Sequence, residues 1–238
     1  MSTVLILGSS PSVVACREWP RAPFDRIVAI NNAWAVRPDW DDLVHPWDFA
    51  ADRLPSTLRA GQRIITEADF VPAQNAYGGF VYAGATMAFT TAYWVLQALK
   101  PRTIAFFGCD MVYDTADQTH FYGKGSPDPL RSDITLQSLE AKSARLRICA
   151  ARQSCAVVNL SVGKTRLALP RADRRDLPTL PIDYDQHTAT LADRQEAALG
   201  YYSPTGRYWE ELDRFDPAAL AALDDLWLRA GSHPKIAA

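Results

Sequence analysis

Cysteine is scarce in this chain, with four residues among 238. No two of them have CxxC spacing, and their density is far below that of a disulfide scaffold. We therefore expect reduced, mostly buried thiols, which suits a cytoplasmic protein. The four residues are Cys16, Cys109, Cys149 and Cys155.

A surplus of charge of one sign is also missing. The formal net charge is −2, the sequence pI is about 6.1, and the 25 Lys and Arg residues are spread along the chain. This balance gives no electrostatic case for binding nucleic acid or an acidic membrane surface. The sequence contains no internal repeat and no low-complexity segment.

Long hydrophobic runs are absent as well. A membrane-spanning helix needs about 20 apolar residues, and no stretch of the sequence reaches that length. The opening residues, "MSTVLILGSS", contain an apolar run too short for a signal peptide. We therefore expect a soluble protein, and 238 residues are enough to bury a substantial core.

Short apolar runs alternate with helix-compatible segments over the first two thirds of the chain. Helices are predicted at 84–100, which Lys100 and Pro101 close, and at 133–153, where Asp133 is a good N-cap. The predicted strands are "TVLILG", "RIVAIN", "DDLVH", "QRIIT", "TIAFFG" and "CAVVNLS". This alternation predicts an α/β fold with a doubly wound, mainly parallel, Rossmann-like sheet and helices on both faces.

The character of the sequence changes after Leu169. Residues 170–187 are rich in proline and charge, and two or three helices are predicted beyond them, the last capped by Asp216. We therefore divide the chain into an α/β domain, 1–169, and a C-terminal helical extension, 170–238. The extension either packs on the sheet or serves in assembly.

Four segments with ligand-binding side chains follow predicted strands or begin a helix. In open parallel sheets, ligands bind outside the carboxyl ends of the strands, where helix N-termini direct their free N–H groups. The first segment comprises Gly8, Ser9, Ser10 and Ser12, whose glycine permits close approach and whose hydroxyls can bind phosphate or a sugar. It lacks a P-loop lysine and full GxGxxG spacing, so it also fits a tight turn with a helix cap.

Asparagines and small residues make up the next two segments. Asn31 and Asn32 follow the second strand and can recognise a base, a ribose or a phosphate, although asparagine also favours turns. Gly84 and Thr86 begin the helix at 84–100, where a ligand can approach the helix dipole. Ordinary helix capping also explains this second pair.

The fourth segment, "DMVYDTADQTHFYGKGSPDP", follows the buried strand "TIAFFG". Asp110, Tyr113, His120 and Tyr122 lie close together in it. A lone histidine is more often structural than catalytic, but this one follows a strand end among tyrosines. It is therefore our candidate for acid–base chemistry.

Together these motifs resemble the small bacterial sialyltransferases that use CMP-sialic acid, and the wider superfamily around them. That superfamily includes motility-associated glycosyltransferases that modify flagellin and archaeal-type 6-hydroxymethylpterin diphosphokinases. The similarity covers roughly the first two thirds of the chain. The stretches that carry it are "LILGSSPSVV", "AINNAW", "GATMAFTTAYWVLQALKPRTIAFFGCDMVY" and "HFYGKGSPDP".

The resemblance implies an inverting glycosyltransferase that moves a sialic-acid-like sugar from a nucleotide-sugar donor, a CMP-sugar, to a hydroxyl acceptor such as a glycan. It assigns the general base to His120 and stabilisation of the leaving phosphate to Tyr113 and Tyr122. No metal is required in that family, because hydroxyls and helix dipoles offset the phosphate charge. With the loop residues above, the expected donor-binding set is Gly8, Ser9, Ser10, Ser12, Asn31, Asn32, Gly84, Thr86 and Asp110.

Two alternatives stay open. A pterin-type diphosphokinase needs Mg²⁺ held by carboxylates, for which Asp48 and Asp110 are the strand-end candidates. A non-catalytic nucleotide-binding or assembly protein would use the aromatic helices at 201–212 and 220–230 as its partner surface. Homo-oligomer formation and peripheral membrane association through a lipid-linked acceptor stay open too, whereas nucleic acid is not an expected partner.

Overall fold

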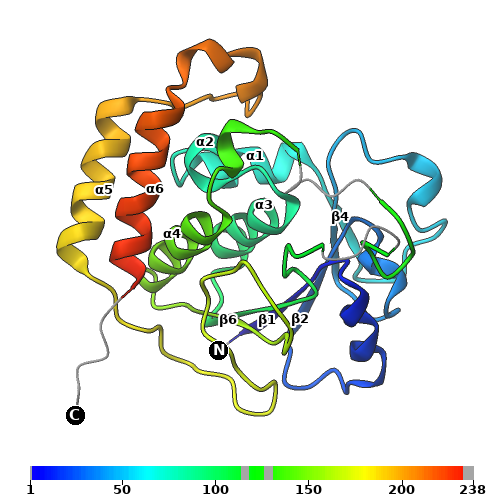
Figure 1. Ribbon diagram of the computed structural model, residues 1–238. Coiled ribbons are helices and arrows are strands. Elements are labelled where there is room, and N and C mark those ends of the chain that lie inside the picture. The colour runs from blue at the N-terminus through cyan, green and yellow to red at the C-terminus, as the bar shows by residue number, and fades with distance from the viewer. Residues whose placement is uncertain (1, 114–117, 126–130, 233–238) are drawn as a thin grey trace.

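A parallel β-sheet forms the centre of the computed structural model, which describes residues 2–113, 118–125 and 131–232. Within these residues, six strands lie in the order β4-β3-β2-β1-β5-β6 (Figure 1). The strands are β1 (Thr3–Leu7), β2 (Arg26–Ile30), β3 (Asp42–Val44), β4 (Arg63–Ile65), β5 (Thr103–Phe107) and β6 (Ala156–Asn159). The predicted α/β, Rossmann-like fold is confirmed, including its two short strands β3 and β4.

The strand order creates a switch point beside the central strand. From β1 the chain adds β2, β3 and β4 outward on one side, and then β5 forms on the other side of β1. Leu7, at the end of β1, pairs with Ala29 of β2 and with Phe107 of β5. The loops that leave these three strands therefore start side by side, where ligands bind in open parallel sheets.

The two faces of the sheet are covered by different kinds of helix. Alternate residues of β1 divide between the faces, with Val4 and Ile6 in one hydrophobic cluster and Leu5 and Leu7 in the other. The first cluster packs under α-helices, and the second under short 3-10 helices and loops. The helices are α1 (Glu67–Asn75), α2 (Phe80–Ala83), α3 (Met87–Trp94), α4 (Leu139–Ala151), α5 (Gln186–Leu199) and α6 (Pro217–Gly231) on the first face, and η1 (Pro11–Glu18) and η2 (Asn31–Ala35) on the second.

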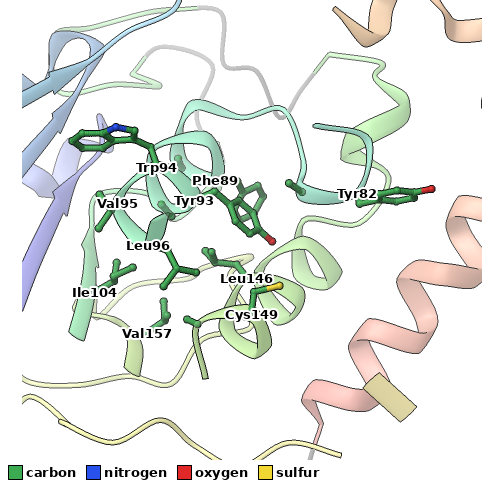
Figure 2. Packing of buried hydrophobic residues seen from close by; sticks show 14 of the residues in the cluster. Tyr82, Phe89, Tyr93, Trp94, Val95, Leu96, Ile104, Leu146, Cys149 and Val157 are labelled. Atoms are coloured by element: carbon green, nitrogen blue, oxygen red, sulfur yellow. The ribbon is translucent and has the colours of Figure 1, made fainter. Parts of the chain in front are cut away.

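The cluster under the α-helices joins elements that are far apart in the chain. Leu96, Ile104, Leu146 and Val157 come from four different elements and point toward one another (Figure 2). They are fully or almost fully buried. Burying such a side chain stabilises the fold by roughly 1.5–3 kcal/mol, so this contact region holds the helices on the sheet.

The helix predicted at 84–100 is shorter than expected and irregular at its end. It begins after Thr86, passes from α3 into a π-helical turn, η4 (Val95–Leu99), and ends at Lys100, whose φ is +47°. Gly84 therefore lies before the helix and not in its first turn. The predicted C-terminal stop is confirmed.

The helix predicted at 133–153 consists of two pieces. Asp133 caps only the 3-10 turn η6 (Ile134–Leu136), since its Oδ1 accepts from both the N–H and the hydroxyl of Thr135, at 2.8 and 2.7 Å. The longer α4 starts after Ser138, whose hydroxyl caps it. The prediction that Asp133 caps the long helix is therefore wrong, because Thr135 occupies its carboxylate.

The C-terminal extension packs on the sheet domain through buried ion pairs. Helices α5 and α6 run antiparallel, and α6 lies between α5 and α4 (Figure 1). Lys142 Nζ lies 2.8 Å from Asp224 Oδ1, and Arg145 Nε lies 2.6 Å from Glu196 Oε1. Trp227 Nε1 also donates to Glu196, at 2.8 Å. Residues of α5 and α6 belong to the same hydrophobic cluster as β1, so the extension shares the main core.

Two further predictions agree with the structure. All four cysteines are buried free thiols, and Asp216 caps α6 by accepting from the Ala218 N–H at 2.8 Å. Among the described residues, no helix combines the length and the apolar character that a membrane crossing needs. Two parts of the predicted histidine segment, 114–117 and 126–129, and the end of the extension, 233–238, lie outside the described residues.

Candidate functional site

A cleft of about 930 Å³ opens beyond the carboxyl ends of β1, β2, β3 and β5. The loops after these strands and the first turn of α3 form its walls. Small-molecule sites typically occupy about 300–1,000 Å³. The cleft therefore has the size of a ligand site and lies at the edge of the sheet where the sequence predicts one.

Most of the predicted site residues line this one cleft, although they come from separate loops. The lining includes Gly8, Ser9, Ser10, Asn31, Asn32, Thr86, Tyr113, His120 and Tyr122. Ser12, Gly84 and Asp110 lie outside the lining. The fold thus brings together nearly all of the expected donor-binding and catalytic groups.

The loop after β1 is held against the end of β5. The Gly8 N–H donates to the Phe107 carbonyl, and the Ser10 N–H donates to the Gly108 carbonyl, each at 2.9 Å. A Cβ atom on Gly8 would lie 2.3 Å from the Gly108 oxygen, so only glycine permits this approach. Ser12 Oγ lies 2.9 Å from Ser10 Oγ and thereby orients a hydroxyl that lines the cleft.

Two residues of the lining have a left-handed backbone, which is uncommon for residues other than glycine. The φ angle is +50° at Asn31 and +56° at Met111. Such conformations cost about 1–3 kcal/mol each and cluster at functional sites. The Asn31 Oδ1 atom is also buried and has no hydrogen-bond partner among the described residues. A buried acceptor without a partner is costly, which points to a hydrogen-bond donor from outside the described residues.

Thr86 and Gly84 differ in their surroundings. The Thr86 hydroxyl caps α3 by accepting from the Phe89 N–H at 3.3 Å, and this buried residue also lines the cleft. The N-terminus of α3 therefore faces the cleft with its free N–H groups. Gly84 has a φ of +86°, and a Cβ atom there would lie 3.0 Å from the Phe89 ring and 3.1 Å from Lys142. Because Gly84 has no side chain, Phe89 and Lys142 can pack closely against it.

The side chain of Asp110 is hydrogen-bonded to the edge strand β6. Its Oδ1 accepts from Asn159 Nδ2 at 3.0 Å, and the residue is buried. Asp48, the other acid considered for a metal, lines the cleft. The two carboxylates therefore do not share the cleft. Across the described parts of the chain, no group of three or more His, Cys, Asp or Glu side chains is arranged to hold a metal ion.

Residues 120–123 form a tight backbone turn that is hydrogen-bonded to the loop after β1. His120 and Gly123 exchange two backbone hydrogen bonds, at 2.9 and 3.0 Å. The Phe121 N–H donates to the Ser9 carbonyl at 2.9 Å. The histidine is thereby fixed relative to the serines of the opposite wall.

The imidazole of His120 lies among aromatic rings and one hydroxyl. Its centroid is 4.9 Å from that of the stacked Tyr122 ring and 6.1 Å from that of Tyr113. Thr119 Oγ1 lies 2.8 Å from Nδ1 and also accepts from the Gly125 N–H at 2.9 Å. Burial lowers the pKa of His120 below its usual value, which favours the neutral ring. The neutral ring is the form that accepts a proton.

Three residues around the cleft were not predicted from the sequence. Thr119 contacts the histidine ring, and the exposed Arg53 and Lys124 add positive charge to the lining. Lys124 lies between two glycines just after His120, so its position in the sequence was a usable signal. Arg53 lies in the loop after the short strand β3, and that loop carries no motif that would have drawn attention to it.

The fold and the cleft define this chain as an α/β protein with a Rossmann-like sheet and a cleft at the sheet's switch point. No family model, no curated protein and no solved structure matches it.

Proposed function

We propose that this protein is an inverting glycosyltransferase that moves a sialic-acid-like sugar from a CMP-sugar to a hydroxyl acceptor. One observation carries the proposal. A half-buried histidine, two tyrosines, and loops bearing serine, asparagine and threonine all line one cleft. These are the kinds of group to which the resemblance to the sialyltransferases assigns catalysis and donor binding.

The donor nucleotide is bound through hydroxyls, helix N–H groups and cations. Ser10 and the N-terminus of α3 supply neutral donors for a phosphate, and Arg53 and Lys124 offset its charge. The unpartnered Asn31 Oδ1 accepts from a donor on the nucleoside, such as the cytosine amino group or a ribose hydroxyl. These contacts support a nucleotide-sugar donor whose phosphate is stabilised without metal.

His120 acts as the general base in this proposal. Because Thr119 engages Nδ1, Nε2 is the nitrogen that takes the proton of the acceptor hydroxyl. As that proton leaves, the acceptor oxygen bonds to the anomeric carbon from the side opposite the nucleotide. The bond between the anomeric carbon and the phosphate oxygen breaks, and its electron pair leaves with CMP. Tyr113 and Tyr122 stabilise the departing phosphate by donating hydrogen bonds.

Thermal unfolding with added nucleotides tests the donor class. We expect CMP and CDP to raise the melting temperature and ATP to leave it unchanged, since a ligand at 100 times its Kd adds about 2.7 kcal/mol of stability. Stabilisation by ATP with Mg²⁺, and not by cytidine nucleotides, would favour the diphosphokinase alternative. No response to any nucleotide would contradict the proposal.

The His120→Ala variant tests the base. Release of CMP from CMP-sialic acid is expected to fall about 10²–10⁴-fold, which is the usual contribution of a positioned acid or base. Stabilisation by CMP should persist, because the donor contacts remain. The matched control is His187→Ala, which removes an exposed histidine of α5. Full activity of the His120→Ala variant would contradict the proposal that His120 is the general base.

A further inference from the structure

A second cleft, of about 1,370 Å³, adjoins the first. Pro46, Asp48 and Met87 line both clefts, so the two clefts lie side by side. The second cleft exceeds the range of about 300–1,000 Å³ that is usual for small-molecule sites. Its size therefore fits an extended ligand that reaches toward the first cleft.

The C-terminal extension builds one wall of this second cleft, through the segment 205–212. The Tyr208 hydroxyl donates to Asp133 Oδ2 at 2.6 Å, which ties the wall to the turn before α4. Gly206 is packed so closely that a Cβ atom on it would lie 2.9 Å from the Phe80 ring. The wall is therefore held in place before any ligand arrives, which lowers the entropic cost of binding.

Exposed indole rings and an unpartnered carboxylate line the second cleft. Trp47 is 73% exposed and Trp209 is 48% exposed, so both rings are open to a ligand. The Glu67 Oε1 atom is buried there without a hydrogen-bond partner among the described residues. An oligosaccharide suits this combination, because its C–H faces stack on indoles and its hydroxyls donate to carboxylates.

The charges of the second cleft favour a neutral ligand. Its two arginines are already paired, Arg131 with Asp133 at 2.9 Å and Arg207 with Glu210 at 3.4 Å. The wall therefore offers little net positive charge to an acidic acceptor. A purely hydrocarbon ligand would match the apolar side chains of the lining but would leave Glu67 Oε1 without a hydrogen-bond donor.

We infer that the second cleft binds a neutral oligosaccharide acceptor and that the extension thereby determines the acceptor class. The inference rests on the proposed function, because it takes the first cleft as the donor site. The bound chain runs past Asp48 and Met87, with its terminal hydroxyl directed to His120.

Binding of the full chain to an array of neutral glycans, with α- and β-linked hexose and N-acetylhexosamine oligomers, tests the inference. We expect binding to at least one oligomer. Trp209→Ala should weaken that binding at least tenfold, and Trp209→Phe should recover part of it by restoring an aromatic face. Tyr202→Ala should bind as the parent does, because Tyr202 is an exposed aromatic residue outside both clefts.

Measuring CMP binding in the same samples separates the two proposals. The inference would be overturned if the protein binds CMP but no neutral glycan. It would also be overturned if the protein binds CMP and, among the acceptors, only acidic glycans or polyprenol-containing vesicles. Equal glycan binding by Trp209→Ala and the parent would overturn it too. If the protein binds a glycan through Trp209 but does not bind cytidine nucleotides, the result would support an acceptor site in the second cleft and contradict the proposed CMP-sugar donor.

Discussion

At the scale of single residues, the site depends on how the surroundings of His120 set its ionisation. The Tyr122 ring covers one side of the imidazole, and Thr119 contacts Nδ1. The principal effect on the pKa of His120 is burial, which penalises the charged ring. Its pKa is therefore lowered, so the neutral form of the ring persists to a lower pH than in a free histidine.

The rate of sugar transfer is expected to rise with pH through an apparent pKa below about 6.5, the usual value for histidine. The sign follows from burial, because the neutral ring persists to lower pH in the folded protein than in the unfolded chain. The same linkage removes stability as pH falls below about 6.5, since the unfolded state binds the proton first. A pH profile of kcat checks this, and an acidic limb centred above pH 7 would contradict it.

Not every residue-scale prediction had equal support in the sequence. The serine, asparagine and histidine motifs are far apart along the chain and contribute side chains to one cleft. The roles of Gly84 and Asp110 could not be deduced from the sequence. Gly84 packs near Lys142, and Asp110 bonds to Asn159, so in each case the partner is distant in the sequence.

At the scale of elements, the junction between the loop after β1 and the end of β5 positions the cleft. Gly8 and Gly108 lie in adjacent strand ends and approach each other closely. The same loop accepts the Phe121 N–H through the Ser9 carbonyl. A change in this junction therefore affects both the sheet and the position of His120.

Substitution Gly8→Ala is expected to destabilise the protein by about 1–3 kcal/mol, the usual cost of overpacking. The new Cβ atom would lie 2.3 Å from the Gly108 oxygen and 2.6 Å from Cys109 Sγ, and the first of these is backbone that cannot rotate away. Denaturation by urea measures the loss. Gly163→Ala is the matched control, because a Cβ atom there has no neighbour within 4 Å. Equal stability of the two variants would contradict the close packing.

Helix boundaries were the least predictable features at this scale. The apolar pattern predicted helices where α3 and α4 lie, but α4 starts after Ser138 and not after Asp133. Both residues are good N-caps by type, so local propensity does not distinguish them. In the structure the Asp133 carboxylate is occupied by Thr135 through Oδ1 and by the Tyr208 hydroxyl through Oδ2, and Ser138 caps the long helix.

At the scale of the whole molecule, the extension is part of the fold. It shares the main hydrophobic cluster, and its Asp224 and Glu196 neutralise two cations of α4. Removing residues 170–238 would leave Lys142 and Arg145 without these partners. The packing therefore favours a structural role for the extension over a detachable assembly element.

Substitution Lys142→Met is expected to cost about 3–5 kcal/mol, because it leaves Asp224 buried without its cation. The double variant Lys142→Met, Asp224→Leu should recover much of that loss, since no charge then remains buried. Arg166→Met, which breaks the half-exposed pair with Glu140, should cost far less. Chemical denaturation measures all three. A loss in Lys142→Met no larger than in Arg166→Met would show that the buried pair does not hold the extension.

The sequence by itself determined the parallel α/β sheet and the edge at which the cleft lies. Apolar runs of strand length that alternate with helices have few ways to pack, and the carboxyl ends of parallel strands meet at one edge. Only the tertiary structure decided that Thr119 contacts His120 Nδ1 and that Arg53 lines the first cleft. It also decided that the extension forms one wall of the second cleft. These features depend on how side chains and loops meet in space, which local sequence patterns do not encode.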